Sequence, residues 1–473
     1  MAKSAKHYSF LLLISCIGCL FIKAVNKDQH PGRLEILFLG HKSKHHDSEQ
    51  LAAIFTKEYF KDGINITYST DPGDLNKEYL KRFSGLILYA NYDSITMLQE
   101  RALLDFVKNE KGFIPLHCAS YCFRNSAEVV EIIGGQFLSH QYDSFPATIL
   151  KPDHPVMKSI ETFSVKDETY VHARLSNKIE VLTERVEGGR HEPYTWVRPY
   201  GSGRVFYTTY GHDENTFNHP AFLKMVENGI FWAVGDKARA ALNAFPLASP
   251  EYSAAEIPNY ERRDPAPKLQ APLDPARSMS LIQVPPGFEL QLFASEPDIV
   301  NPIFINWDEK RRLWLIETVD YPNEIKASDK GDDRIRILED TDGDGKADKF
   351  TVFADKLNIP TSFTFSNGGI IVSCAPSFLF LKDTDGDDRA DIRKEMLKGW
   401  GKSDTHAQAS NLRYGLDNKI WGVVEYSGFD GKIGDSSLKF GSGLYRFSPD
   451  GKSLDYLSTL IMLCMRPLKT FGR

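Results

Sequence analysis

In the second half of the chain the sequence reads Asp340-Thr-Asp-Gly-Asp-Gly-Lys-Ala-Asp348. A closely similar stretch, Asp383-Thr-Asp-Gly-Asp-Asp-Arg-Ala-Asp391, follows it. Carboxylates at alternate positions around a glycine turn present several oxygens to one Ca²⁺ ion. We therefore expect calcium in both loops. The predicted ligands are Asp340, Asp342, Asp344 and Asp348 in the first loop and Asp383, Asp385, Asp387 and Asp391 in the second.

The two acidic loops belong to a longer repeat. Pairs of apolar runs begin at Phe304, Phe363 and Leu412, and each pair is followed by an acidic turn: the two aspartate loops, then Ser448–Gly451. Self-similarity at about 40 to 50 residues is typical of the four-stranded blades of a β-propeller. Residues 280–459 are therefore predicted to form a partial all-β propeller. We attribute the third turn to hairpin conformation alone.

The first half has a different pattern, in which short apolar runs alternate with amphipathic stretches. Runs at 34–39, 85–89, 112–116 and 204–210 are typical of buried strands, and stretches at 48–60, 94–110 and 220–232 have helical spacing. This alternation predicts a doubly wound, mainly parallel α/β sheet. Ligands of such sheets bind beyond the carboxyl ends of the strands.

Length and composition indicate two domains in a globular protein. The chain has 473 residues, of which 25% are charged, and a net charge of −6 without a long basic run, which argues against nucleic-acid binding. Seven prolines lie between Pro246 and Pro275 and favour an extended spacer. We predict an α/β domain at 30–240, a linker at 241–279 and the β domain at 280–459.

The first 29 residues are typical of an export signal. Lys3 and Lys6 precede an uncharged stretch, Phe10 to Phe21, that is too short to span a membrane. Leu13-Ile-Ser-Cys16 resembles a lipoprotein cleavage box, so Cys16 is either a lipid attachment point or an ordinary cysteine of the signal. The expected location is the periplasm or cell envelope, with or without a lipid anchor to the membrane.

Histidines follow the predicted strands of the first domain. His41, His45 and His46 come after the first strand, His117 after the run at 112–116, and His212 after the run at 204–210. Imidazole serves as a ligand or as an acid and base near neutral pH. Because parallel strands end at one edge of a sheet, we expect these side chains to share a site.

Five motifs in the correct order carry a resemblance to a known family. They are Leu116-His117-Cys-Ala119, Gly134-Gly-x-Phe-x-x-His140, Asp153-His-Pro155, Asp167-Glu168-x-Tyr170 and Gly201-x-Gly-Arg-Val-Phe-Tyr207…Gly211-His212. They resemble the ThuA-like (trehalose utilisation) family. The resemblance implies a class I glutamine amidotransferase-like, flavodoxin-type fold and a role in bacterial sugar metabolism.

The resemblance suggests site residues but not a cysteine nucleophile. Cys118 lacks the flanking glycines of a Gly-x-Cys-x-Gly elbow, so we expect it to be a packing residue. His117, His140, Glu168 and His212 are predicted to do acid–base or binding work on a sugar or keto-sugar. The residues expected to contact this substrate are His46, Asp167, Tyr170 and Tyr210.

The second half resembles the membrane-bound dehydrogenases of planctomycete and verrucomicrobial type, which are similar to soluble quinoprotein glucose and sorbosone dehydrogenases. The motifs are Val284-Pro-Pro-Gly-Phe-Glu289, the loop Asp340–Asp348, Thr405-His406 to Asp417 and Ser442-Gly-x-Tyr-Arg-Phe447. The resemblance implies that His406 is a catalytic base, that pyrroloquinoline quinone is the cofactor and that a protein accepts the electrons. Residues 460–473 lack the blade pattern. We therefore expect that the ring of propeller blades is incomplete and that the protein is a truncated or frame-shifted product.

Together these patterns predict an exported carbohydrate-active protein with a truncated dehydrogenase-like propeller. Two alternatives stay open. One is a non-catalytic glycan-binding protein, and the other is an amidotransferase-like hydrolase that uses Cys118. The enzyme prediction requires His117, His140, Glu168 and His212 to line one pocket, whereas the hydrolase requires an exposed Cys118 with a histidine in reach.

Overall fold

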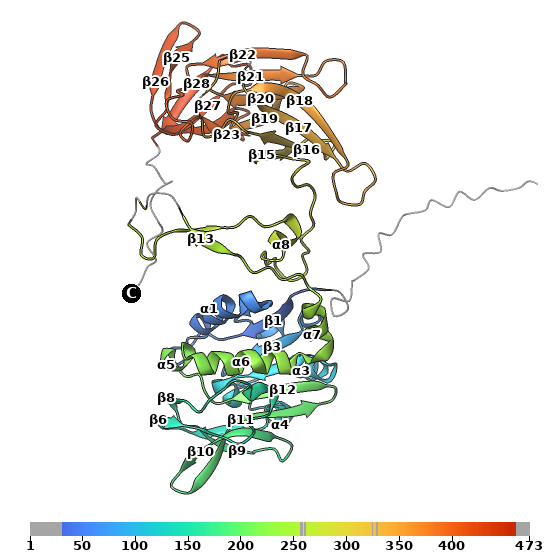
Figure 1. Cartoon of the computed structure of the whole chain (residues 1–473), viewed down its shortest axis with the longest axis vertical. Coiled ribbons are helices and arrows are strands. Elements are labelled where there is room, and N and C mark those ends of the chain that lie inside the picture. Colours follow the sequence, from blue (N-terminus) through green and yellow to red (C-terminus); the bar gives the residue numbers. More distant parts are fainter. Residues whose placement is uncertain (1–30, 256–258, 260–261, 324, 328–329, 460–473) are drawn as a thin grey trace, which may run out of the picture. The chain divides into compact units, whose positions relative to one another are not determined.

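The structure is a computed structural model that describes residues 31–255, 259, 262–323, 325–327 and 330–459. The described residues fall into two compact units that divide between Glu289 and Leu290 (Figure 1). The predicted export signal and the predicted aberrant tail, 460–473, lie outside the described residues. Within the described ranges, no helix is long and apolar enough to cross a membrane.

The first unit is built on an eight-stranded sheet. Its strand order is β2-β1-β3-β4-β12-β11-β10-β7, and the neighbours among the first five strands are parallel. The strands are β1 (Leu34–Leu39), β2 (Ile64–Ser69), β3 (Gly85–Leu88), β4 (Gly112–Pro115), β12 (Gly203–Thr208), β11 (Arg190–Tyr200), β10 (Glu180–Glu187) and β7 (Thr148–Ile149). The predicted strands are present within two residues of their expected ends.

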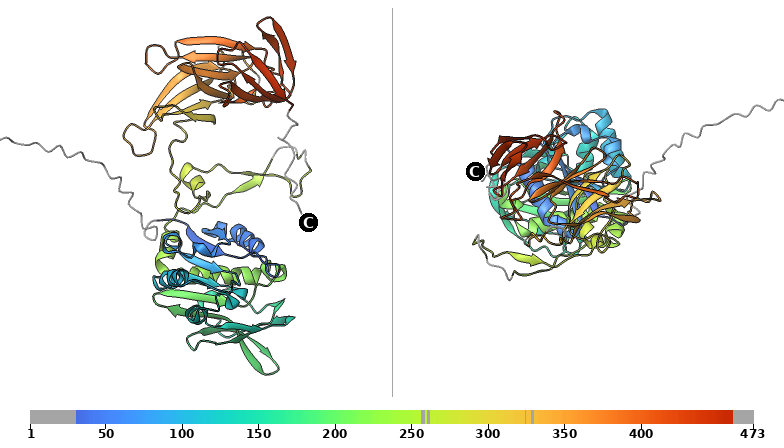
Figure 2. Two further views of the ribbon diagram at one scale, coloured as in Figure 1. Left: turned by 180° about the vertical axis from the view of Figure 1, so that it is seen from behind. Right: turned by 90° about the horizontal axis from the view of Figure 1, so that it is seen from above.

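Helices cover both faces of this sheet, as the alternation of runs predicts. They are α1 (Ser48–Tyr59), α2 (Lys77–Leu80), α3 (Met97–Lys108), α4 (Ala127–Ile133), α5 (Glu214–Phe217), α6 (Pro220–Ala233) and α7 (Gly235–Asn243). Ile36 and Phe38 of β1 pack with α1 and α6, whereas Leu37 and Leu39 pack with α3 and α4. Successive side chains of a strand point to opposite faces, so the apolar run of β1 supplies two hydrophobic layers. Figure 2 shows this unit from behind as well.

Local capping sets where the main helices begin. The Asp47 carboxylate accepts a hydrogen bond from the Gln50 backbone N–H at the start of α1, and Thr96 and Gln99 form a capping box at the start of α3. Helix α6 starts at Pro220, a position where the missing N–H of proline costs nothing. The observed helices 48–59, 97–108 and 220–233 match the predicted ranges to within three residues.

An antiparallel extension of the sheet is the main departure from the predicted fold. Strands β11, β10 and β7 continue the sheet in antiparallel pairing beyond β12. Two small sheets are formed by segments on either side of β7 in the sequence, and they pair β5 (Gln136–Ser139) with β9 (Val171–Ala173) and β6 (Tyr142–Pro146) with β8 (Ser164–Glu168). Strands β5 and β6 are mostly exposed or half-buried, and the buried side chains of β8 include Asp167 and Glu168, so these short strands lack the apolar runs that predict the other strands.

The predicted linker has more structure than an extended spacer. It contains an antiparallel pair, β13 (Tyr252–Ala254) with β14 (Lys268–Gln270), and the short helix α8 (Pro275–Met279). Ser280 is buried and its carbonyl accepts a hydrogen bond from Arg33. The residues up to Glu289 therefore belong to the first unit, although the predicted β domain begins at 280.

The second unit contains three four-stranded antiparallel sheets. The first joins β15 (Pro302–Trp307), β16 (Leu313–Glu317), β17 (Asp333–Glu339) and β18 (Lys349–Leu357). The second joins β19 (Ser362–Ser366), β20 (Gly369–Cys374), β21 (Ser377–Lys382) and β22 (Ile392–Lys398). The third joins β23 (Ser410–Tyr414), β24 (Ile420–Val424), β27 (Gly443–Phe447) and β28 (Leu454–Ser458), and a separate hairpin pairs β25 (Phe429–Ile433) with β26 (Ser436–Phe440).

Each acidic turn lies between the third and fourth strands of its sheet. The first aspartate loop joins β17 to β18, the second joins β21 to β22, and Ser448–Gly451 joins β27 to β28. Apolar side chains of adjacent sheets share cores, as Trp314 and Phe363 do. The sheets therefore agree with the predicted repeat of four-stranded units.

The contact between α6 and the sheet generates a stability prediction. A Cβ built on Gly229 of α6 would lie 2.3 Å from the ring of Phe206, which is fully buried in β12. Replacing glycine by alanine inside a helix ordinarily stabilises by about 1 kcal/mol. Overpacking costs about 1–3 kcal/mol. We expect Gly229→Ala to lower the unfolding temperature of the first unit in calorimetry of the whole chain.

Gly441→Ala is the control for this experiment, because an added Cβ at Gly441 meets no atom within 4 Å. It should leave the calorimetric transitions nearly unchanged. A rise in the unfolding temperature with Gly229→Ala would contradict the close packing of α6 on β12.

Candidate active site

Polar side chains gather at the carboxyl edge of the parallel strands. His41 and His46 follow β1, Tyr89 follows β3, His117 follows β4, and His212 follows β12. These four strands are neighbours in the sheet and run in the same direction. The ring of His46 lies 5.2 Å from that of His117 and 5.5 Å from that of His212. The structure therefore brings together three of the histidines that the sequence singled out.

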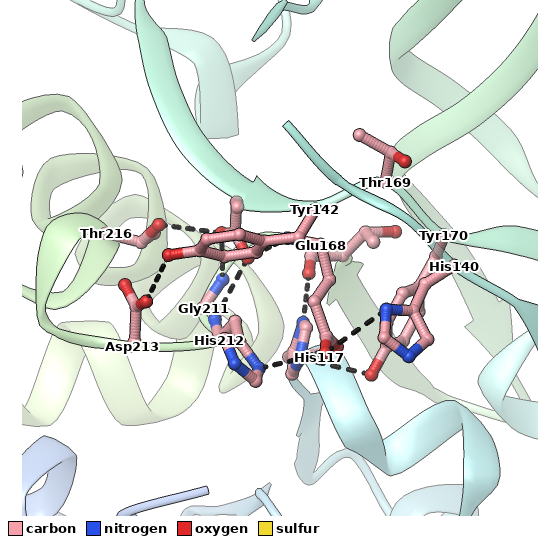
Figure 3. A network of polar contacts seen from close by, with 12 residues as sticks. His117, His140, Tyr142, Glu168, Thr169, Tyr170, Gly211, His212, Asp213 and Thr216 are labelled. Atoms are coloured by element: carbon pink, nitrogen blue, oxygen red, sulfur yellow. Dashed lines mark hydrogen bonds and ion pairs between the residues drawn. The ribbon is translucent and has the colours of Figure 1, made fainter. Parts of the chain in front are cut away.

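Glu168 lies at the centre of this group (Figure 3). Its Oε2 is 3.2 Å from Nε2 of His117, and its Oε1 is 3.2 Å from Nδ1 of His140 and 3.3 Å from Nδ1 of His212. Glu168 ends strand β8, and His140 lies in the loop between β5 and β6. One carboxylate thus contacts three imidazoles that come from separate parts of the chain.

His117 is held in a strained turn between β4 and the 3₁₀ helix His117–Tyr121. Its φ is +46°, in the left-handed region that is costly for a residue with a side chain. Nδ1 lies 2.6 Å from the carbonyl oxygen of Thr209, and because a carbonyl only accepts, Nδ1 carries the proton. Nε2 therefore faces Glu168 and the hydroxyl of Tyr170, which is 3.1 Å away.

Cys118, the next residue, does not have the exposure that a nucleophile needs. The thiol lies close to His41 and His46, but Cys118 is buried. Burial raises the pKa of this thiol well above its usual value, so it stays protonated. The strained position of the turn belongs to His117 instead, and the expectation of a packing role for Cys118 agrees with this placement.

Asp167 holds the backbone of the loop that carries His212 and does not face the cleft. Its two carboxylate oxygens accept hydrogen bonds from the backbone N–H groups of Glu168, Gly211 and His212 and from the hydroxyl of Thr216. The side chain is fully buried. Asp167 therefore positions the loop that carries His212, and this geometry gives it no direct contact with a substrate.

The charges of the group follow from these contacts. Burial alone would raise the pKa of the Glu168 carboxyl, but the contacts with the imidazoles of His117 and His212 outweigh it and hold the pKa well below its usual value. Burial would lower the pKa of His212, yet its contact with the charged Glu168 raises it. Burial, with the neighbouring His117 and His212, lowers the pKa of His46 to about 2. The site thus combines an ionised carboxylate with imidazoles of unlike basicity.

An open cleft of about 780 Å³ reaches this group from solvent. His46 and His212 line it, together with polar side chains of the loop after β1 and of α5. The lining includes Lys42, Lys44, Asp47, Gln50, Asp213, Glu214 and Asn215. The His140 side chain is 43% exposed, whereas that of His117 is fully buried. Substrate could therefore reach His140, His212 and His46 but not His117 directly.

Two other predicted residues have different surroundings. Tyr170 is buried and contacts His117, as described above. Tyr210 packs in the hydrophobic core against Phe145, Phe163 and Tyr194. Its ring is 1% exposed, so the expected contact of Tyr210 with substrate is not supported by its position.

The sequence reasoning missed several residues of the site. Tyr89 donates a hydrogen bond to the carbonyl oxygen of Gly211, and Tyr142 donates one to Asp213 at 2.5 Å. Tyr89 ends a predicted strand next to the histidines, which is a signal that could have identified it. Tyr142 begins a short exposed strand, and no pattern in the sequence distinguishes it.

The aspartate loops of the second unit have matching hydrogen bonds. Asp340 accepts from the N–H groups of Gly343 and Gly345, and Asp383 accepts from those of Gly386 and Asp388. Oxygens of Asp340, Asp342 and Asp344 lie within 4.8 Å of one another, as do those of Asp383, Asp385 and Asp391. Asp348 instead accepts hydrogen bonds from Thr341, and Asp387 accepts from the N–H of Arg389.

His406 lies in the loop before β23, with its side chain 63% exposed. Nδ1 is 2.9 Å from Asp404, and the ring packs against Tyr321. Pyrroloquinoline quinone stays an expectation from the resemblance alone.

The support that Asp167 gives to the His212 loop can be tested by Asp167→Asn. An amide offers only one acceptor oxygen and turns N–H donors toward the Gly211 and His212 N–H groups or toward the Thr216 hydroxyl. Leaving buried donors unsatisfied costs about 1–3 kcal/mol. We expect a lower unfolding temperature of the first unit by calorimetry. The exposed Asp153→Asn is the control, and equal stability of the two variants would contradict the supporting role.

The comparisons with known proteins also divide the chain into two parts, although the second match begins within the first unit. The family model described as Trehalose utilisation (ThuA) matches residues 35–233, and a domain of unknown function, DUF7133, matches residues 274–461.

No curated protein matches the chain. A ThuA-like protein from Bacteroides uniformis is 21% identical, covers 42% of this chain and 91% of its own, and has a TM-score of 0.38. One from Parabacteroides merdae is 18% identical, covers 46% and 94%, and has a TM-score of 0.38. The first unit therefore has a flavodoxin-like fold and is similar to ThuA domains over residues 35–233, and residues 274–461 match a domain of unknown function.

Proposed function

We propose that the first unit is an enzyme that transfers protons on a sugar or keto-sugar. The observation that carries this proposal is that one buried carboxylate, that of Glu168, contacts three imidazoles beside an open cleft. These are the imidazoles of His117, His140 and His212. Perturbed titratable groups that converge in a cleft are the usual mark of a catalytic site.

The geometry suggests a role for each side chain. His140 and His212 are accessible and share Glu168 Oε1, so either can take a proton from a hydroxyl or from the carbon beside a keto group. Glu168 stabilises the imidazolium that forms. His117 is buried and fixed through Thr209, which makes it a positioning residue for Glu168 rather than a group that touches substrate.

Two observations favour a carbohydrate as the substrate. The family model that matches residues 35–233 is described as Trehalose utilisation, and trehalose is a carbohydrate. The cleft is lined by hydrogen-bonding side chains such as Lys42, Gln50 and Asn215, which suit a ligand with many hydroxyl groups. Binding of a saccharide without reaction is the alternative proposal, and it predicts affinity without turnover. The hydrolase alternative would need a reactive Cys118, which is buried.

For the second unit we propose the dehydrogenase-like propeller and calcium binding expected from the sequence. Three consecutive four-stranded sheets and the repeated acidic loops support this proposal. His406 as a base, pyrroloquinoline quinone, an electron-accepting protein, export and the lipid anchor also stay proposals, and they rest on the sequence resemblances alone.

The proposed chemistry is tested by turnover of disaccharides and of their 3-keto forms by the whole chain. Loss of a general acid or base typically costs about 10²–10⁴ in rate. We expect a loss of this size in kcat with His140→Ala and with Glu168→Gln. His191→Ala, a control at an exposed residue paired with Glu184, should keep full activity. Saccharide binding by calorimetry with no turnover of any substrate would favour the non-catalytic alternative.

Calcium binding is a separate prediction for the second unit. Titration of chelator-treated whole chain should release or absorb heat and reveal about two Ca²⁺ ions, one for each loop. Asp342→Ala combined with Asp385→Ala should abolish this binding and the accompanying rise in unfolding temperature. Asp450→Ala, in the turn attributed to conformation, should have no effect. Absence of a heat signal with native protein would refute calcium binding.

A further inference from the structure

The side chains around Glu168 are also arranged as ligands of a metal ion. His46, His117, Glu168 and His212 each offer one ligand atom, and these four atoms lie within 4.8 Å of one another. They come from four separate segments: the loops after β1, β4 and β12, and the end of β8. We infer that these residues bind one divalent transition-metal ion, of the Zn²⁺ class, in the proposed active site.

The chemistry of the ligand set agrees with this class of ion. Three imidazoles and a carboxylate are typical ligands of zinc and of similar first-row metals, whereas calcium and magnesium prefer oxygen. Two ligands about 2.1 Å from a tetrahedral ion lie about 3.4 Å apart. The contacts of Glu168 with His117 and His212, at 3.2 and 3.3 Å, are close to this spacing, and each uses a different oxygen of the carboxylate. Only a modest closure of the side chains is therefore needed to surround an ion.

The partner of His117 Nδ1 prepares this ring for metal binding. Nδ1 donates to the Thr209 carbonyl oxygen, so Nε2 is the nitrogen directed at Glu168, and a metal ion would bind there by displacing the Nε2 proton. A backbone carbonyl on the remote ring nitrogen is the usual outer-shell arrangement of a metal-bound histidine. It fixes both the tautomer and the orientation of the ring.

His46 distinguishes a metal site from a simple hydrogen-bond network. Contacts with Glu168 account for His117 and His140 without any ion, whereas the buried Nδ1 of His212, 3.3 Å from Glu168, has no well-aligned hydrogen bond. His46 is 9% exposed, and its buried Nδ1 has no hydrogen-bond partner among the described residues. Buried polar atoms are nearly always satisfied, so this imidazole calls for a partner that the protein itself does not supply. A metal ion between His46 and the other three residues would satisfy it.

Access to the ion would come from the cleft. His46 and His212 line it, so a hydroxyl or carbonyl oxygen of a ligand could reach an open coordination position. Such an ion would polarise a keto group or lower the pKa of a bound hydroxyl beside His140. This substrate side of the inference rests on the proposed function, whereas metal binding by itself does not.

The test measures metal binding without any sugar. Whole chain is stripped with chelator, returned to buffer containing Ca²⁺ to occupy the acidic loops, and titrated with Zn²⁺. We expect one tight equivalent and a rise in the unfolding temperature of the first unit. His46→Ala and Glu168→Gln should weaken this binding by more than about 100-fold, since even outer-shell changes cost about 10- to 100-fold.

His140→Ala is the matched control, because His140 contacts Glu168 but is not one of the four ligands. It should keep the zinc stoichiometry. Equal zinc affinity of the native chain and His46→Ala would overturn the inference. If His46→Ala fails to fold, X-ray absorption at the zinc edge of the native chain decides. Scattering from imidazoles would support the site, and an all-oxygen environment would overturn it.

The outcomes also separate this inference from the proposed function. One bound zinc ion without turnover of any saccharide would support the metal site and contradict the enzyme proposal. Full turnover of keto-sugars by metal-free protein would support the enzyme and overturn an ion in its active site.

Discussion

The buried charge of Glu168 is the constraint on which the site depends. An ionised carboxylate removed from water is costly unless it is paired and hydrogen-bonded. His117, His140 and His212 provide those partners, and each must arrive from a different part of the chain. Strands β4 and β12 therefore have to end at the same edge of the sheet, and the loop between β5 and β6 has to bring His140 to that edge. Asp167, directly before Glu168, fixes the loop of His212 by the same kind of bond.

Much of this convergence is predictable, because it follows from topology. The apolar runs of β1, β3, β4 and β12 are visible in the sequence, and parallel neighbours place the residues that follow them at one edge. His46, His117 and His212 could therefore be grouped before any coordinates existed. Tyr210 shows the limit of that rule. It also follows a strand, but its ring turns into the core among Phe145 and Tyr194, and strand position alone does not tell which way a side chain points.

The part of the site that comes from the short strands was less predictable. Strand β6 is largely exposed, and the buried positions of β8 include two acidic residues, so hydrophobic periodicity does not reveal this pair. Glu168 and His140 entered the prediction through motif resemblance, whereas Tyr142, which has no motif, did not. The left-handed backbone conformation of His117 was not predictable from the sequence either, because glycine or asparagine usually occupies such a position.

The aspartate loops and the histidine cluster around Glu168 differ in how many of their polar atoms already have hydrogen-bond partners within the protein. In the aspartate loops, backbone N–H groups of the turn already bond to Asp340 and Asp383, so conformation explains much of the motif without an ion. Around Glu168 the protein satisfies the carboxylate but leaves a buried nitrogen of His46 without a partner. An unmet bonding capacity is a stronger sign of a missing ligand than a concentration of charge. The physical case for a bound ion is therefore better at the histidine cluster than at the loops whose sequence first suggested metal.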